Sequence, residues 1–122
     1  MSHLTCVSVA LLLLSSTAHP APTSDVEKKR IESLISTVEN LKDAKFVRNG
    51  TEYDCKAAAE HMRDKWQYAG SKVKTARDFI TLIATKSSQS GKPYLIRFKD
   101  GTQVESGKYL TEQLEKLESP GK

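Results

Sequence analysis

The sequence is poor in the residues that cross-link small exported domains or hold metal ions. It contains two cysteines, Cys6 and Cys55, and three histidines in 122 residues. Cys55 is the only cysteine that follows the N-terminal hydrophobic stretch, so we expect no internal disulfide. A zinc site needs three or four converging ligands, and this chain offers too few for us to expect a metal or a cofactor. The hydrophobic core must then stabilise the fold alone.

The longest hydrophobic run is too short to cross a membrane. Residues 7–14 read VSVALLLL, without a charge, whereas a bilayer span takes roughly 20 apolar residues. Ser16 and Ala18 supply the small side chains that a signal peptidase requires. We therefore expect residues 1–18 to be a signal peptide, cut after Ala18, and the protein to be periplasmic or secreted and not transmembrane after cleavage. An uncleaved N-terminal anchor is the alternative. Cys6 precedes the hydrophobic run, which argues against a lipid-modified cysteine.

The excess of positive over negative charge is also small. The net charge is +4, and every Lys, Arg, Asp and Glu lies after residue 18. Basic residues alternate with acidic ones, as at Arg63 and Asp64, which is typical of a solvated helix face. We expect no nucleic-acid partner, because an exported chain meets envelope proteins, anionic cell-wall polymers and lipid headgroups first.

Apolar spacing and turn signals predict the elements of the rest of the chain. Ser24 begins a helix whose apolar residues recur at helical spacing, and Asn49-Gly50 joins two short strands. Asp54 is expected to cap a second helix that stops at Gly70. Further elements are a third helix capped by the Thr75-Asp78 box, a strand at 94–98, a tight turn at 100–101, a strand at 102–104 and a last helix capped by Ser106.

These elements predict an α+β fold, with about four helices packed around a small antiparallel sheet made from two short hairpins. The expected boundaries are a flexible leader at 19–23, one domain at 24–118 and a frayed tail at 119–122. On the last helix, the inner side is expected to carry Tyr109, Leu110, Leu114 and Leu117.

No catalytic motif emerges from the spacing of reactive residues. Cys55 belongs to the apolar stripe of its helix, so burial is the simpler interpretation of it. His61 lies on the flank of the same helix beside acidic residues. Ser90-Gly91-Lys92 lacks the glycine and the Ser or Thr of a phosphate loop. The loop at 86–93 could hold a carboxylate, phosphate or glycan, or it could simply connect a helix to a strand.

Three segments of the sequence, FVRNGTEYDCKAAAEHMRDKW, TARDFI and SSQSGKPYLI, resemble the YfeK-like family of small bacterial envelope proteins of unknown function. The resemblance covers residues 31–117. It implies a bacterial origin and a periplasmic or secreted location, and it supplies no activity. It directs attention to polar residues that packing does not obviously require: Arg48, Asn49, His61, Lys65, Ser87, Ser88, Ser90, Lys92 and Tyr94. The alternative is a purely structural role, in which Asn49-Gly50 and Gly91 set backbone geometry and Tyr94 packs in the core.

We expect a non-enzymatic binding or accessory protein whose partner is another envelope protein or an anionic cell-wall or lipid component. The contact surface would lie near Arg48, Lys92 and Tyr94. One alternative is a small hydrolase or transferase that uses His61 as base and Ser88 or Ser90 as nucleophile, which requires the helix and the loop to meet. Another is a protein inhibitor of a hydrolase.

Overall fold

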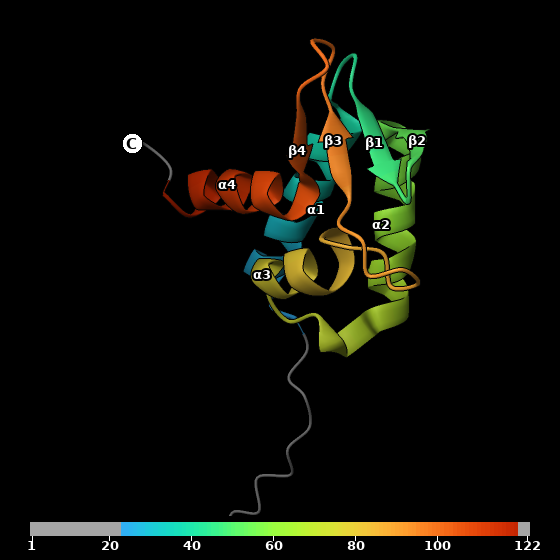
Figure 1. The fold of residues 1–122 in the computed structure, drawn as a ribbon. Coiled ribbons are helices and arrows are strands. Elements are labelled where there is room, and N and C mark those ends of the chain that lie inside the picture. The colour runs from blue at the N-terminus through green and yellow to red at the C-terminus, as the bar shows by residue number, and fades with distance from the viewer. Residues whose placement is uncertain (1–22, 120–122) are drawn as a thin grey trace, which may run out of the picture.

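The computed structural model describes residues 23–119 as one α+β unit (Figure 1). The predicted signal peptide and most of the predicted leader therefore lie outside the described residues. In chain order the elements are α1 (Asp25–Glu39), β1 (Lys45–Arg48), β2 (Thr51–Asp54), α2 (Cys55–Ala69), a 3-10 turn (Gly70–Lys72), α3 (Ala76–Phe79), the π-helix η2 (Ile80–Ala84), β3 (Leu95–Arg97), β4 (Gln103–Glu105) and α4 (Ser106–Glu118). Helix, hairpin, helix, helix, hairpin, helix is the predicted order, and the predicted fold class is confirmed.

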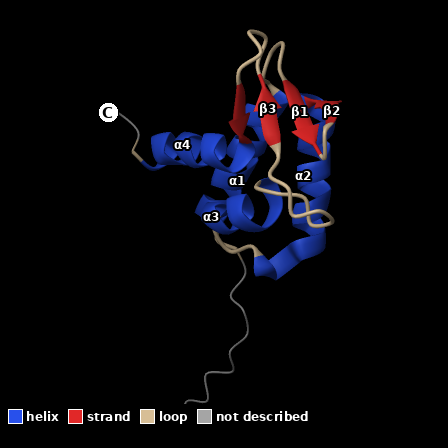
Figure 2. Cartoon of the chain, viewed as in Figure 1, coloured by secondary structure: helices blue, strands red, loops and turns tan. Residues whose placement is uncertain are grey.

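The two hairpins form one antiparallel sheet in the order β2-β1-β3-β4. In the register, Phe46 lies opposite both Tyr53 and Ile96, and Ile96 lies opposite Val104. These four residues form the row that faces the helices. Figure 2 shows the strands at one end of the molecule, with the helices grouped behind and beside them. Ion pairs cross the opposite face, Lys45 with Asp54 and Arg97 with Glu52.

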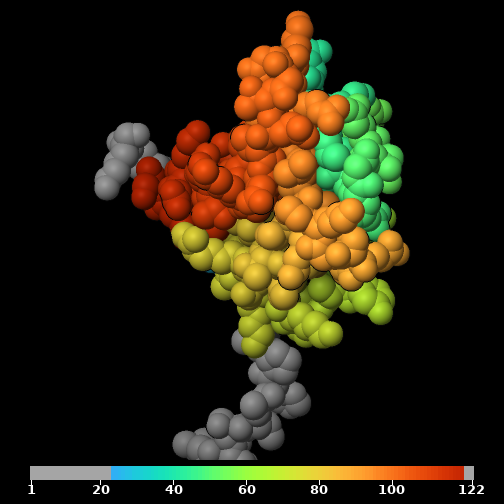
Figure 3. Space-filling view, viewed as in Figure 1, coloured from blue at the N-terminus to red at the C-terminus, as the bar shows by residue number. Residues whose placement is uncertain are grey.

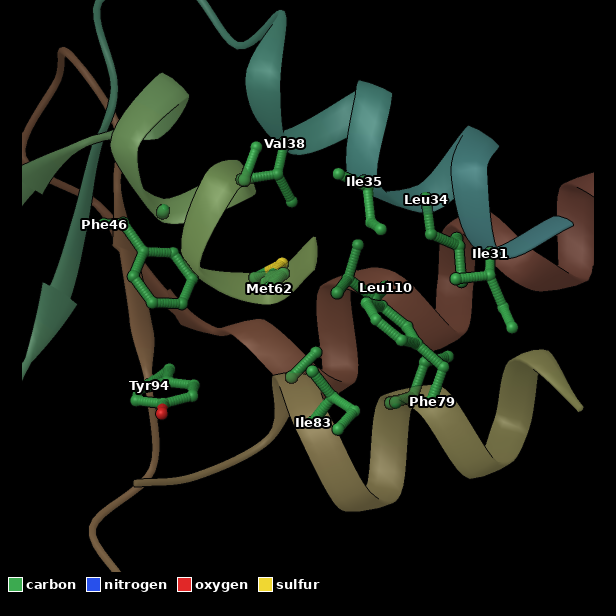
Figure 4. Packing of buried hydrophobic residues seen from close by; sticks show 14 of the residues in the cluster. Ile31, Leu34, Ile35, Val38, Phe46, Met62, Phe79, Ile83, Tyr94 and Leu110 are labelled. Carbon is green, nitrogen blue, oxygen red and sulfur yellow. The ribbon is translucent and has the colours of Figure 1, made fainter. Parts of the chain in front are cut away.

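The core is a single cluster that joins all four helices to the sheet. Figure 4 shows side chains from α1, α2 and α4 meeting those of the third helix and of β1. The fully or almost fully buried members include Ile31, Leu34, Ile35, Val38, Phe46, Met62, Phe79, Ile83, Tyr94, Leu110 and Leu114. Leu117, which was expected on the inner side of the last helix, is 39% exposed because it lies beyond the last turn of α4 that reaches the core.

The helix starts only partly follow the predicted capping residues. Ser24 caps α1, and Thr75 with Asp78 forms the predicted capping box. Asp54 stands at the cap position of α2, but its carboxylate accepts from the ammonium of Lys45 and makes no cap bond. Ser106 is the first residue inside α4 and Glu105 takes the cap position, because the β4 ladder runs directly into the helix. Those two predicted side-chain caps are therefore wrong.

The third helix changes character halfway along. It begins as α3, continues as the five-residue π-helix η2 and ends at Thr85. Apolar spacing predicted its buried face, Ala76, Phe79, Ile80 and Ile83, correctly, but it gave no sign of the wider turn. Within residues 23–119, no helix has the length and apolar character that crossing a membrane requires.

Gly107, in the first turn of α4, marks the closest approach between α4 and the end of the third helix. A β-carbon at this position would lie 2.8 Å from Thr85 Oγ1, and that hydroxyl is committed to the main-chain oxygen of Ile80. An alanine normally favours a helix by about 1 kcal/mol relative to glycine. Here the collision with Thr85 outweighs that gain.

We therefore expect Gly107→Ala to lower the free energy of unfolding by about 1–2 kcal/mol, as overpacking does. Urea denaturation would measure this change. Adding Thr85→Ala removes the two closest atoms and should reduce the cost of the Gly107→Ala step by half or more. A more stable Gly107→Ala protein would contradict the close approach of α4.

Candidate functional site

The antiparallel pairing of β1 and β3 brings the predicted site residues to one end of the sheet. β1 ends at Arg48 at the end where β3 begins. The loop at 86–93 precedes β3, so it meets the β1-β2 turn and the flank of α2. Figure 3 shows this loop lying on the surface beside the green β1-β2 hairpin. The sequence placed the same residues on separate elements, and the sheet topology brings them together.

Asn49 joins the hairpin turn to the loop. Asn49 and Gly50 both have positive φ, at 51° and 79°, as a type I′ hairpin turn requires. The Asn49 amide donates to Ser87 Oγ at 3.4 Å, and its carbonyl accepts from the Ser90 hydroxyl. The turn and the loop, about forty residues apart in the chain, are thereby held in one arrangement.

Ser87 organises the loop from inside. Its side chain is fully buried, and its hydroxyl accepts from the main-chain N–H of Gln89 at 3.3 Å and, more weakly, of Ser90. The main-chain oxygen of Ser87 accepts from Gly91 at 2.8 Å. Ser87 was predicted as a contact residue. Because Ser87 is buried, it supports the loop and does not contact a partner. Its hydroxyl provides the acceptor that backbone N–H groups of the loop need where water does not reach them.

Tyr94 is a packing residue and not a surface contact, which corrects its predicted role. Its side chain is 2% exposed, and its ring packs on Phe46 with centroids 5.1 Å apart. Its hydroxyl accepts from Lys65 Nζ at 3.1 Å. The alternative expectation, that Tyr94 packs in the core, is the correct one.

Lys65 is half-buried, and its ammonium group is also engaged inside the molecule. Besides the Tyr94 hydroxyl, it donates to the main-chain oxygen of Ile83 at 2.9 Å. Ile83 belongs to the last turn of η2, where carbonyl groups lack helical partners and a cation is favourable. Lys65 thus closes the C-terminal end of the π-helix.

Arg48 and His61 face each other across the gap between the sheet and α2. Together with Phe46, Tyr53, Ala57 and Ala58 they line a cavity of about 240 Å³. Burial lowers the pKa of His61 from its ordinary value of 6.5, and the charges of Arg48 and Lys65 lower this pKa further, whereas Asp64 raises it. His61 is therefore mostly neutral at neutral pH.

Arg48 is held without an acceptor for its buried nitrogen. Its Nε is inaccessible to solvent and makes no hydrogen bond in the described part of the chain, a situation shared there only with the Ser106 hydroxyl. An unsatisfied buried donor costs about 1–3 kcal/mol. Because Nε is closed off from solvent, Arg48 can offer a ligand only the rest of its guanidinium group at the cavity that it lines.

The remaining predicted residues are exposed. Ser88, Ser90 and Lys92 lie on the loop surface, and the N–H of Lys92 donates to Ser90 Oγ at 3.2 Å. Ser88 and His61 border one surface cavity of about 470 Å³, yet residues 23–119 contain no hydrogen bond between His61 and a serine hydroxyl. Ser90 donates its proton to Asn49 instead. The helix and the loop do meet, but the nucleophile-base contact of the hydrolase alternative is not formed.

Cys55 belongs to the hydrophobic core. Cys55 is buried at the start of α2, as its place in the apolar stripe predicted, and burial raises the pKa of its thiol. Its Sγ lies 3.4 Å from the main-chain oxygen of Ala44. Over the described range 23–119, no three His, Cys, Asp or Glu side chains converge.

The sequence reasoning missed the apolar half of the Arg48-His61 cavity. Tyr53 lies opposite Phe46 on the neighbouring strand, and the run Ala57-Ala58-Ala59 keeps the facing side of α2 small. Ala57 is one helical turn before His61, so a signal was present in the spacing. The sequence did not show which strand faces this turn of α2.

Lys65→Met keeps the aliphatic stem but removes the donor to Ile83 and Tyr94. We expect the free energy of unfolding to fall by about 1–3 kcal/mol, because two buried acceptors lose their partner. Lys72→Met, at an exposed lysine bordering the same surface cavity, is the matched control and should change stability little. Equal urea midpoints for the two variants would refute the role of Lys65. In the background of Tyr94→Phe, part of the Lys65→Met cost should disappear.

Comparison with known proteins agrees with the resemblance in the sequence. The family model described as "Family of unknown function (DUF5329)" matches residues 25–118. The uncharacterized protein YfeK of Salmonella typhimurium is 36% identical over 94 residues, which cover 77% of each chain. No solved structure shows a significant match. The matched range contains the whole described fold from α1 to α4, and the chain therefore belongs to the DUF5329 family of unknown function.

Proposed function

We propose that this protein is an exported, non-enzymatic binding module of the bacterial envelope that recognises an anionic partner through the turn-loop surface. We define this surface as Arg48, Asn49, His61, Ser88, Ser90 and Lys92. The observation that carries the proposal is the link from Asn49 to Ser87 and Ser90. This link holds two distant basic segments in one fixed geometry.

Fixed geometry favours binding because little side-chain and loop entropy remains to be lost when a partner arrives. Arg48 sits at the end of a strand, and the Lys92 backbone is tied to Ser90, so neither residue depends on a loose loop. The loop at 86–93 contributes Lys86 and Lys92 and no acidic residue. A surface of this charge supports an anionic partner, such as an acidic protein face, a cell-wall polymer or a lipid headgroup.

Charge reversal would test the turn-loop surface directly. We expect Arg48→Glu/Lys92→Glu to weaken retention of the pure protein on isolated peptidoglycan, on phosphatidylglycerol vesicles or on an immobilised envelope partner by about tenfold or more, a change of roughly 1.4 kcal/mol. Retention would be measured by co-sedimentation and by crosslinking pull-down from the envelope fraction.

Lys29→Glu/Lys116→Glu is the matched control, because it changes the net charge equally at exposed positions of α1 and α4. It should retain binding. Circular dichroism melting would establish that both variants fold. If the folded Arg48→Glu/Lys92→Glu protein and the control bind every one of these targets as the wild type does, the turn-loop surface is not the contact.

Export makes a second, independent prediction. The apolar run at 7–14 followed by Ser16 and Ala18 supports cleavage after Ala18, so the intact mass of protein recovered from the periplasm or the medium should correspond to a chain that begins at His19. Ala18→Arg should block processing and leave the precursor in the membrane fraction. Recovery of the wild-type protein in the cytoplasm, still starting at Met1, would contradict export.

A further inference from the structure

The cavity between β1, β2 and α2 combines an apolar wall with an arginine, Arg48, that makes no ion pair within residues 23–119. Phe46 and Tyr53 lie side by side on the sheet, and Ala57 and Ala58 face them from α2. Two alanines leave space where larger side chains would fill the layer between helix and sheet. The exposed Ala57 and the partly exposed Tyr53 lie at the rim, so the cavity can be entered without unfolding.

The polar side of the cavity is entirely basic or neutral. None of the six lining residues is acidic, and the Arg48 guanidinium makes no ion pair with any residue of the described range 23–119. The charges near His61 are Arg48 from β1 and Lys65 and Asp64 from α2, and Tyr53 is the titratable group that β2 contributes. An acceptor entering here would meet a guanidinium N–H and an imidazole.

We propose that this cavity binds a carboxylate attached to a short apolar group, with the carboxylate on Arg48 and His61 and the apolar group between Phe46 and Ala57. A guanidinium group favours a carboxylate because the two pair in a planar, charge-assisted arrangement. The volume of about 240 Å³ is below the roughly 300–1,000 Å³ of cavities that take drug-sized molecules. The ligand is thus a small organic acid or the C-terminal residue of a peptide.

This inference rests on the proposed function, because Arg48 and His61 serve both, and it names the group that these two residues recognise. It also gives the binding a pH dependence. A carboxylate beside His61 favours the charged imidazolium and raises the depressed pKa of this residue. By linkage, binding takes up protons, so affinity rises as the pH falls through the His61 pKa while the ligand itself stays ionised.

Four small probes would test the carboxylate and the apolar group and would separate the ligand classes. N-acetylleucine carries both the carboxylate and the apolar group, N-acetylleucinamide lacks the charge, and acetate lacks the apolar group. We expect the His61 imidazole NMR signal to report saturable, millimolar binding of N-acetylleucine and a rise of about half a pKa unit or more. 4-Methylpentanoate would behave alike if free acids are accepted and would bind at least fivefold more weakly if a peptide terminus is required.

Substitutions at the rim test the location. Ala57→Leu fills the cavity from an exposed helix position and should weaken N-acetylleucine at least fivefold, and Arg48→Gln should do the same. Ser33→Leu adds the same side chain on the exposed face of α1 and should leave binding unchanged. Equal binding of N-acetylleucinamide, equal effects of acetate, or full binding by a folded Ala57→Leu protein would each overturn the proposal.

Lys92→Glu separates this inference from the proposed function, because Lys92 does not line the cavity. It should weaken retention on the envelope targets and leave N-acetylleucine binding intact. If Lys92→Glu left retention on the envelope targets unchanged and the protein still bound N-acetylleucine, only the proposed role of the turn-loop surface would be refuted. If Lys92→Glu abolished N-acetylleucine binding, the proposal that N-acetylleucine binds in the cavity lined by Arg48 and His61 would be wrong.

Discussion

The arrangement of the whole molecule depends on the burial of Tyr94. Its N–H donates to the main-chain oxygen of Thr85, and its own main-chain oxygen accepts from Ser106. Its ring packs on Phe46 and its hydroxyl accepts from Lys65. One residue directly before β3 therefore fixes the end of the π-helix, the start of α4, the sheet and the flank of α2 relative to one another.

The π-helix and Lys65 belong to the same constraint. A wide turn leaves carbonyl groups without regular helical partners, and such turns are frequent near functional sites. Here the ammonium of Lys65 satisfies the carbonyl of Ile83, which keeps the third helix against α2. The loop that follows then starts from a fixed point and reaches Asn49. The packing around Tyr94 and Lys65 therefore also fixes the geometry of the turn-loop surface.

Local signals predicted the elements well because they act over a few residues. The Asn49-Gly50 turn, the Thr75-Asp78 box and the apolar stripe of α1 all specify their own backbone. The misassigned residues depend on contacts that are distant in sequence. Tyr94 looked like a surface polar residue, because its partners Phe46 and Lys65 lie on other elements. Ser87 is buried where the loop meets Asn49 of the distant hairpin turn. The Asp54 cap failed for a related reason, since Lys45 across the hairpin competes for the same carboxylate. The neighbourhood of Arg48 and His61 required the sheet order, which no local pattern contains.

The two edges of the sheet have a consequence for how copies of this protein behave when crowded. The edge strands β2 and β4 are four and three residues long, and each leads directly into a helix. Glu52 and Asp54 place charges on one edge and Glu105 on the other. A neighbouring chain that tried to extend the sheet would have to place its backbone beside these charged side chains and would find only a few backbone groups to pair. The geometry that ends each strand so early thus also protects the protein against fibrillar self-association.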